Sequence, residues 1–379
     1  MAEVIFDKLT KRYGDVLAVS GLDLLVHDQE LLVLVGPSGC GKTTTLRMIA
    51  GLEEPCSGQI RIDGRLVNNR KPKDRQVAMV FQHGALYPHL DVYRNLAFGL
   101  QLRRRPAAEI DQRVREAARL LGLEELLARQ PWQLSGGQRQ RVAVGRAIVC
   151  QPTVFLLDEP LSHLDGPLRN ALRTELVQLQ QRFAATMMLV THDQVEAMTM
   201  GQRIAVMIAG RIQQVDTPLA VYDAPANRCV AEFIGSPTMR FLTGVMRSES
   251  AGWQVELAAG RFPLPPEQYE RCGPWAGRQL TIGVRPEAVR DVRPAGSDGF
   301  WLPLRAEVVL VQPLGSETIL ELQCGDQQLA ARSIHGARLI TFYDTGHVVP
   351  EERPEAFNEV LGDFLDELDA DEFEEPVVS

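Results

Sequence analysis

A glycine-rich segment, GPSGCGKTT (36–44), contains the residues whose types and spacing point most directly to chemistry. It has the pattern G-x-x-x-x-G-K-T, and it lies between the apolar run LLVLV (31–35) and the helix-like run KTTTLRMIAGL (42–52). Glycines allow successive backbone N–H groups to face phosphate oxygens, and the helix N-terminus adds a partial positive charge. In such a loop Lys42 contacts the β- and γ-phosphates and the Thr43 hydroxyl ligates Mg²⁺. The sequence therefore predicts nucleoside triphosphate binding by the loop residues Gly36, Pro37, Ser38, Gly39, Cys40, Gly41, Lys42, Thr43 and Thr44.

Two adjacent carboxylates follow a second apolar run in the segment VFLLDE (154–159). The four apolar residues predict a buried strand, and open α/β sheets place their ligands at the carboxyl ends of such strands. Asp158 can hold the Mg²⁺ shell, and Glu159 can accept a proton from an attacking water. An apolar run followed by two acids is often only a strand end, but the phosphate loop upstream favours a hydrolytic site.

A third segment, QLSGGQRQRVAVGRAIV (133–149), places a serine, two glycines and a glutamine at the start of another predicted helix. Its first turn could bind an anion, although a simple Ser N-cap uses the same residues. One phosphate chain scarcely needs two such helix starts from one subunit. Here the sequence resembles the ATP-binding-cassette ATPases, whose signature motif is LSGGQ. The resemblance implies that a signature made of Ser135, Gly136, Gly137 and Gln138 closes over ATP held by the phosphate loop of a dimer partner.

Further landmarks of that family occur in the same order along the chain. The resemblance implies that Tyr13 stacks on adenine, that Gln82 reaches Mg²⁺ and the attacking water, and that His192 hydrogen-bonds the γ-phosphate. It also implies that Asp165 contacts the opposite subunit. Tyr13 could instead pack on a core as an ordinary strand residue. We therefore expect ATP as the nucleotide, catalysis by Glu159, His192, Gln82 and Lys42, and Mg²⁺ bound by Thr43, Gln82 and Asp158.

The spacing of apolar runs predicts the elements that must position these residues. Short apolar strands at 77–81, 154–157, 187–190 and 204–208 alternate with helical patterns, such as those around 109–121 and 167–183. Uninterrupted apolar strands between helices are typical of a mostly parallel sheet buried on both faces. We therefore expect an α/β P-loop NTPase cassette at 1–235, with an antiparallel β subdomain and a helical insertion at about 83–150.

The pattern changes after AEFIGSP (231–237), where short β-like runs alternate with Pro and Gly turns. Several short strands at such spacing predict a small β-barrel or sandwich. Segments such as VTHDQVEAM (190–198) and IGVRPE (282–287) resemble the maltose- and glycerol-phosphate-type importer ATPases, in which an OB-like β domain follows the cassette. We expect an all-β, OB-like regulatory domain at 236–349, shortened relative to that family. The β-like runs lie at 242–246, 253–258, 280–284, 306–315 and 318–324.

The C-terminal segment departs from the family pattern. Residues 351–379 contain twelve Asp or Glu and one Arg, so we expect a helix and a solvated acidic tail at 350–379. The run TGHVVPEERPEAFNEVLGDFL (345–365) is similar to the end of an α/β-hydrolase, in which a histidine completes a catalytic triad. A triad needs a Ser on a G-x-S-x-G elbow, and the sequence has none. His347 therefore has no nucleophile to serve, and we expect no esterase activity.

Composition excludes several classes of protein. The net charge is −9, and because the C-terminal segment carries that acidity, the rest of the chain is near neutral and lacks the basic surface of a nucleic-acid binder. The six cysteines form no C-x-x-C pair, which argues against structural zinc and for a reducing compartment. No apolar run reaches the roughly 18 residues of a membrane span, and the N-terminus lacks the apolar core of a signal peptide.

The resemblance as a whole implies an ATP-hydrolysing subunit of a bacterial-type importer for sugars, polyols or glycerol phosphate. We expect a homodimer or a heterodimer with a close paralogue, held at the cytoplasmic face of the cell membrane by integral permease subunits. A substrate-binding protein would be an indirect partner. The alternatives are an importer ATPase for another substrate and a soluble cassette ATPase of repair or translation. The sequence has neither the long heptad insertion between phosphate loop and signature that repair types need nor the second cassette that translation types generally carry.

Overall fold

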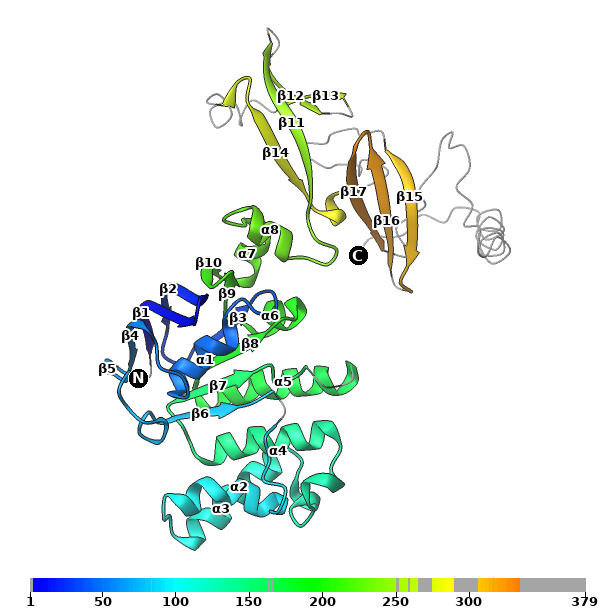
Figure 1. Cartoon of the computed structure of the whole chain (residues 1–379). Helices are drawn as coiled ribbons and strands as arrows, with labels where there is room; N and C mark the ends of the chain where they lie inside the picture. Colours follow the sequence, from blue (N-terminus) through cyan, green and yellow to red (C-terminus); the bar gives the residue numbers. More distant parts are fainter. Residues whose placement is uncertain are drawn as a thin grey trace, which may run out of the picture. The chain divides into compact units, whose positions relative to one another are not determined.

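The computed structural model describes residues 3–82, 84–162, 164, 166–249, 252–257, 260–264, 275–289, 306–315 and 317–334. The chain divides into two compact units, Met1–Thr238 and Met239–Ser379 (Figure 1). Among the helices of the described residues, none combines the length and the apolar character needed to cross a membrane.

A six-stranded sheet forms the centre of the first unit, in the order β10-β9-β3-β8-β7-β6. The strands from β9 to β6 pair in parallel, and β10 adds an antiparallel edge. The predicted mostly parallel sheet is thus confirmed, and the strand that leads into the phosphate loop lies in its interior. The bounds are β3 (Leu31–Val35), β6 (Val77–Val80), β7 (Val154–Asp158), β8 (Thr186–Thr191), β9 (Arg203–Ile208) and β10 (Arg211–Asp216).

Both faces of this sheet are buried, and strand β3 shows why its sequence is apolar at every position. Leu31, Val33 and Val35 belong to a core formed with α2 (Val92–Leu102), α3 (Ala107–Leu120), α4 (Gly136–Val149), α5 and α6. Leu32 and Leu34 belong to a second core, formed with α1 and a four-stranded antiparallel sheet. Alternate side chains of a strand point to opposite faces, so a strand buried on both sides has no polar position. The helices on these faces are α1 (Lys42–Ala50), α5 (Gly166–Phe183) and α6 (Gln194–Met200).

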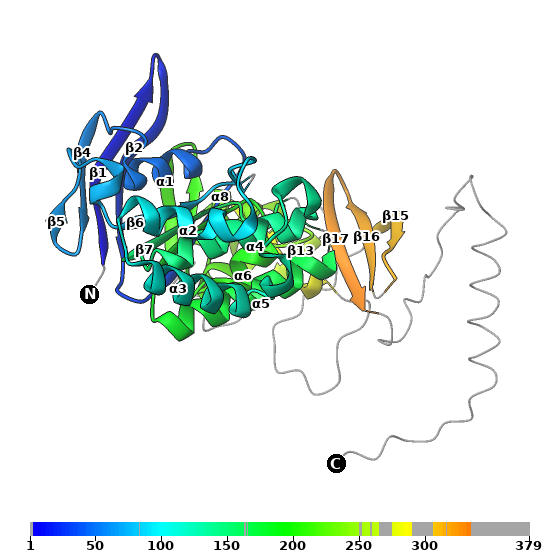
Figure 2. The ribbon, with the colours of Figure 1, turned by 90° about the horizontal axis from the view of Figure 1, so that it is seen from below.

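The antiparallel sheet of the first unit has the order β2-β1-β4-β5. Figure 2 shows these strands gathered at the left edge of the unit. Their buried apolar residues alternate with exposed positions, as expected for a sheet with one solvated face. The strands are β1 (Val4–Tyr13), β2 (Val16–Val26), β4 (Ser57–Ile62) and β5 (Arg65–Leu66).

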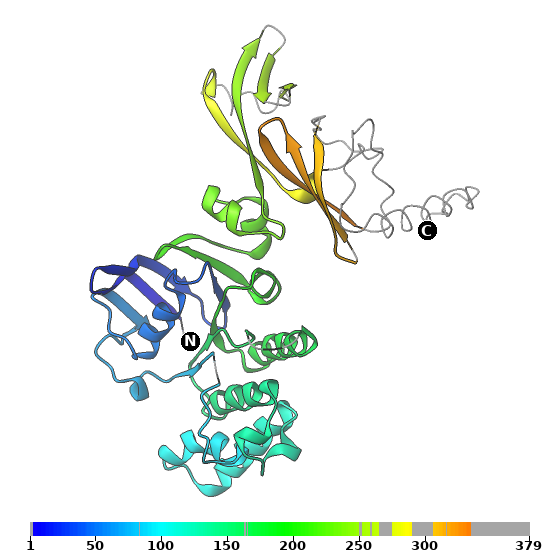
Figure 3. The ribbon, with the colours of Figure 1, turned by 45° about the vertical axis from the view of Figure 1, so that its right-hand side comes forward.

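The predicted helical insertion is also confirmed, as three helices between β6 and β7 that group at one end of the unit (Figure 3). Helix α3 shows the pattern, since its buried residues Ile110, Val114, Ala117 and Ala118 recur at helical spacing. The helices are α2 (Val92–Leu102), α3 (Ala107–Leu120) and α4 (Gly136–Val149), and the unit ends with α7 (Pro218–Asp223) and α8 (Arg228–Phe233).

The second unit contains two antiparallel sheets, in the orders β13-β12-β11-β14 and β15-β16-β17. They share one small core, to which Leu242 and Val255 contribute from the first sheet and Cys324 and Leu329 from the second. Strands β13 and β17 were not predicted, because one is four residues long and the other, QQLAARSI, has few β-branched residues. The bounds are β11 (Arg240–Glu249), β12 (Gly252–Leu257), β13 (Gly260–Pro263), β14 (Gln279–Val284), β15 (Glu307–Pro313), β16 (Glu317–Cys324) and β17 (Gln327–Ile334).

Residues 335–379 lie outside the described residues. The predicted C-terminal helix, the acidic tail, the end of the β domain at 349 and the role of His347 therefore stay predictions.

Candidate nucleotide site

The phosphate loop (36–44) joins strand β3 to helix α1, as predicted, and two of its glycines leave no room for a side chain. Gly41 is the N-cap of α1 with φ +108°, a conformation that residues with a Cβ rarely adopt. A Cβ on Gly41 would lie 2.4 Å from the carbonyl oxygen of Ala18, and one on Gly36 would lie 2.0 Å from that of Met207. The loop is therefore packed against the protein on one side, with a backbone that glycine makes possible.

Lys42 is buried at the first position of α1, and its ammonium group lies inside the loop. Its Nζ donates hydrogen bonds to the carbonyl oxygens of Gly36 at 2.7 Å and Pro37 at 2.8 Å. The Sγ of Cys40 lies 3.7 Å from the same Nζ. Burial raises the pKa of the Cys40 thiol, and the nearby Lys42 charge opposes that shift. Lys42 thus brings a positive charge to the centre of the loop.

A direct hydrogen bond connects the phosphate loop to the first of the two carboxylates. Thr43 Oγ1 donates to Asp158 Oδ1 at 2.8 Å. Asp158 ends strand β7 and is buried. Burial raises its pKa, the neighbouring Glu159 charge adds to the shift, and the Thr43 hydrogen bond opposes it. A hydroxyl and a desolvated carboxylate form the kind of oxygen donor set that suits a hard divalent cation. The two residues fit the proposed Mg²⁺ site.

Glu159 brings two other predicted residues together. Its Oε2 accepts a hydrogen bond from Gln82 Nε2 at 2.9 Å, and its Oε1 lies 3.2 Å from His192 Nδ1. Gln82 follows β6, and His192 follows β8, so neighbouring strand ends meet here. Glu159 has φ +46°, a strained backbone conformation for this residue type and one that clusters at functional sites. Its backbone N–H donates to Val190 of β8 at 2.9 Å, which helps to hold that conformation.

The segment after His192 is fixed by its own hydrogen bonds. Asp193 caps α6 by accepting from the backbone N–H groups of Val195 at 2.7 Å and Glu196 at 3.1 Å. The Thr191 hydroxyl donates to the buried Glu196 carboxylate at 2.6 Å. Burial raises the pKa of Glu196. These contacts hold the residues on both sides of His192, so they position its ring next to Glu159.

The signature residues begin helix α4 with a reciprocal cap. Ser135 Oγ accepts from the backbone N–H of Gln138 at 3.3 Å, and the Gln138 side chain accepts from the Ser135 N–H at 2.9 Å. Gly137 is buried, and a Cβ there would lie 1.9 Å from a methyl carbon of Leu168. Ser135 and Gly136 are exposed. The start of the helix therefore packs against the rest of the unit at Gly137 and is accessible to another chain at Ser135.

Tyr13 lies at the end of strand β1 and is 43% exposed. The Nζ of Lys11 lies 4.8 Å from the centre of its ring. The ring is thus available at the surface and does not fill a core, which is compatible with stacking on a base. Asp165, the remaining predicted residue, lies outside the described residues.

A cluster of side chains that was not predicted from the sequence holds the loop 84–90. Buried Asn95 of α2 accepts from the backbone N–H of Tyr87 at 2.8 Å, and its amide nitrogen donates to three carbonyl oxygens of the segment 87–91. From α4, Arg146 donates to the Ala85 carbonyl at 2.8 Å, with its guanidinium 5.2 Å from the centre of the Tyr87 ring. Asn95 is a polar residue among the apolar positions that form the buried face of α2, and this pattern could have indicated a buried side chain with hydrogen-bond partners.

Comparison with known proteins identifies the family. The profile of the ABC transporter domain matches residues 19–162, and the profile of the MalK OB fold domain matches residues 235–289. The chain is 53% identical over 338 residues to a trehalose/maltose import ATP-binding protein of Thermococcus litoralis, a match that covers 86% of this chain and 89% of the relative. This chain belongs to the ABC transporter ATPase family. The predicted cassette and OB-type domain are thereby confirmed.

Other proteins of the ABC family are also similar to this chain. An sn-glycerol-3-phosphate import ATP-binding protein of Salmonella typhi is 48% identical, with 89% of this chain and 92% of that protein covered. Among solved structures, the ATP-binding cassette MJ0796 in a dimeric post-hydrolysis state with ADP and Pi matches with a TM-score of 0.53 and 30% identity. That match covers 57% of this chain and 98% of MJ0796. The relatives' names are those of import proteins, which favours import over repair or translation.

Proposed function

We propose that this ABC ATPase energises an importer of sugars or of related polyols and glycerol phosphate. The observation that carries the hydrolytic part is the arrangement of Glu159, which contacts Gln82 and His192 directly beside the Thr43–Asp158 pair. The substrate class rests on relatives whose names describe import of maltose, trehalose and sn-glycerol 3-phosphate.

The residues divide the chemistry between them. The backbone of the phosphate loop and Lys42 bind the phosphate chain of ATP, and Tyr13 stacks on its base. Glu159 accepts a proton from the attacking water, while its hydrogen bond with Gln82 and its contact with His192 hold the carboxylate in place. Mg²⁺ held by Thr43, Asp158 and Gln82 would neutralise developing charge on the phosphate oxygens. His192 hydrogen-bonds the γ-phosphate.

The proposed working form is a dimer with two ATP molecules between the subunits. Exposed Ser135 and Gly136 of one subunit cover ATP on the phosphate loop of the other, and Asp165 contacts the opposite subunit. The dimeric state of the MJ0796 cassette supports this arrangement. The partner is a second copy or a close paralogue.

Permease subunits of the membrane are the proposed further partners, and they would hold the ATPase at the cytoplasmic face. The loop 84–90 is suited to receive them, because it begins two positions after Gln82 and is bound to α2 through Asn95 and to α4 through Arg146. A displacement of this loop would reach both the Gln82–Glu159 contact and the signature helix. ATP-driven closure of the dimer would in this way drive alternating access in the permease.

Purification of the tagged full chain from detergent-solubilised membranes of its own cells tests the proposal. We expect integral membrane proteins to co-purify, and ATP hydrolysis by the reconstituted complex to rise when a binding protein loaded with sugar or glycerol phosphate is added. Absence of membrane proteins from the purified sample, together with ATP hydrolysis that does not respond to the loaded binding protein, would contradict the role in import.

A further inference from the structure

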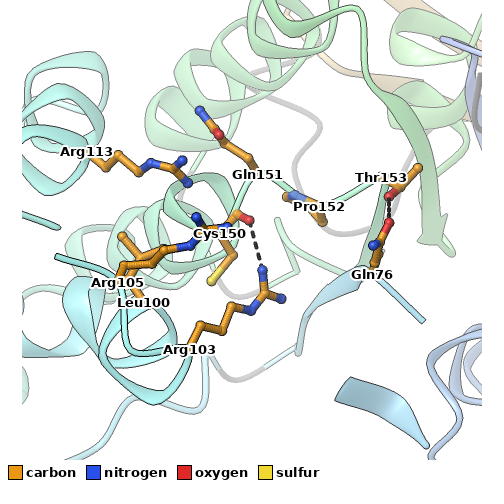
Figure 4. A pocket seen from close by; sticks show the side chains of 9 residues that line it. All are labelled: Gln76, Leu100, Arg103, Arg105, Arg113, Cys150, Gln151, Pro152 and Thr153. Carbon is orange, nitrogen blue, oxygen red and sulfur yellow. Dashed lines mark hydrogen bonds between the residues drawn. The ribbon is translucent and has the colours of Figure 1, made fainter. Parts of the chain in front are cut away.

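A pocket of about 210 Å³ lies at the ends of α2 and α4 that are remote from the nucleotide motifs. Nine residues line it, and three of them are arginines, Arg103, Arg105 and Arg113. Figure 4 shows the three arginines grouped around Cys150 on one side and Gln76 and Thr153 on the other. The pocket thus brings together the segment after α2, helix α3, the connection from α4 to β7 and the residue before β6.

The positive charge of this pocket is not balanced by its lining, which contains no Asp or Glu. Arg113 pairs with Glu109 at 2.7 Å, and Arg105 lies 3.9 Å from the same carboxylate. The single carboxylate of Glu109 therefore lies near two guanidinium groups and can neutralise the charge of only one. Within the described part of the chain Arg103 pairs with no carboxylate, and it donates to the Cys150 carbonyl at 3.3 Å. A bond to a neutral carbonyl fixes the position of a guanidinium without neutralising its charge.

A simpler role for the arginines is to cap the C-terminus of α4. Arg103 bonds the Cys150 carbonyl and Arg113 the Val149 carbonyl, at 3.3 and 3.5 Å. The end of a helix corresponds to about half a negative charge, however, and it is satisfied by one nearby cation. Three arginines offset by one carboxylate exceed that requirement. Each guanidinium also has five N–H groups, of which a carbonyl uses one.

We propose that this pocket is a binding site for a small anion that carries a phosphate group. Guanidinium groups bind phosphate oxygens in a bidentate manner, and charge-assisted hydrogen bonds of this kind are the strong ones. The volume lies below the roughly 300 Å³ at which pockets for drug-sized ligands begin, so it suits a phosphate with a short organic part. The ligand is therefore inorganic phosphate or a small phosphate ester, and the test below separates the two.

This site is distinct from the phosphate loop. Helix α4 begins at the signature and ends at the pocket after 14 residues, a length of about 21 Å. Helix α2 begins beside the loop 84–90 and ends at the pocket after 11 residues, about 16 Å. A bound anion would bridge the helical insertion to the connection before β7. The inference concerns binding alone and does not depend on the proposed import function.

Cys150 provides a direct readout, because its half-buried thiol lines the pocket. The full chain is alkylated with and without inorganic phosphate or glycerol phosphate, and the rate at Cys150 is followed by peptide mass spectrometry. Exposed Cys56 and Cys229 serve as references in the same sample. ATP in the presence of EDTA occupies the phosphate loop throughout. We expect alkylation of Cys150 alone to slow by about tenfold at an anion concentration ten times Kd.

Two double variants make the test specific. Arg103→Gln with Arg105→Gln should raise the anion Kd by about tenfold or more, the factor for one charge-assisted hydrogen bond. Arg115→Gln with Arg119→Gln removes the same charge from exposed positions of α3 outside the pocket and should leave Kd unchanged. Protection by both anions assigns the site to inorganic phosphate and its esters, and protection by the ester alone assigns it to esters. Unchanged alkylation with either anion, or equal protection in both double variants, overturns the proposal.

Discussion

Replacing Glu159 by Gln tests the hydrolytic role with almost no change in size. Glu159 accepts from Gln82 Nε2 at 2.9 Å with one oxygen and lies 3.2 Å from His192 Nδ1 with the other. A carboxylate accepts at both oxygens, whereas an amide accepts at one end and donates at the other. The amide of the variant can still accept from Gln82, but it cannot take a proton from water.

The expected loss of kcat follows from the role of Glu159 as the general base. General-base catalysis contributes about 10²- to 10⁴-fold, which corresponds to about 2.7 to 5.4 kcal/mol of activation free energy. We expect kcat of Glu159→Gln to fall within that range. The affinity for ATP should be unchanged, because Lys42 bonds to the phosphate loop itself and not to Glu159.

Steady-state phosphate release and equilibrium binding of ATP measure the two quantities separately. Glu175→Gln is a matched control, since it neutralises a partly buried carboxylate of α5 whose ion pair, at 3.5 Å, is with Arg141 and not with Gln82 or His192. We expect that variant to hydrolyse ATP at the rate of the unchanged chain. A Glu159→Gln protein that turns over at the rate of the unchanged chain would refute the assignment of Glu159 as the base.

Three other predictions concern stability and the C-terminus. Burial raises the pKa of Asp158, so its ionised form costs folding free energy and stability falls as the pH rises through the folded pKa. Asp158→Asn should therefore raise the unfolding temperature of the nucleotide-free protein at neutral pH and abolish Mg²⁺-dependent hydrolysis. A lower unfolding temperature would contradict this. Gly41→Ala should destabilise the cassette by about 2 kcal/mol or more, because φ is +108° and the new Cβ would lie 2.4 Å from the Ala18 carbonyl oxygen. An unchanged unfolding temperature would contradict this prediction. Truncation after Asp369 and His347→Ala should each leave ATP hydrolysis unchanged, and esterase activity on a p-nitrophenyl ester that His347→Ala abolishes would instead support a hydrolase role.

Much of the cassette could be predicted because its signals are local. The fully apolar runs that became β3 and β7 are what a strand buried on both faces requires. The phosphate loop, Asp158 and Glu159 were found because phosphate binding needs particular residue types at fixed offsets from a strand end. In the second unit, β17 was missed because its burial depends on packing against the other sheet and not on its own composition.

The contacts that hold the site together could not be predicted in the same way. Gln82 and Glu159 are 77 positions apart, and their hydrogen bond depends on how β6 and β7 pair. The positive φ of Glu159 has no sequence signal, because the residue is not Gly, Asn or Asp. Buried Arg75, which donates to the last carbonyls of α1 at Met48 and Ile49, was missed because an arginine normally indicates a surface position.

A mixing experiment tests the central claim, that each ATP is hydrolysed between the phosphate loop of one subunit and the signature of another. Ser135→Arg blocks the signature but leaves its own phosphate loop able to bind ATP, and Lys42→Ala does the reverse. Neither variant alone should hydrolyse ATP. A heterodimer of the two contains one site in which both motifs are intact, so the mixture should regain hydrolysis. No recovery in a mixture in which heterodimers demonstrably form would contradict the account.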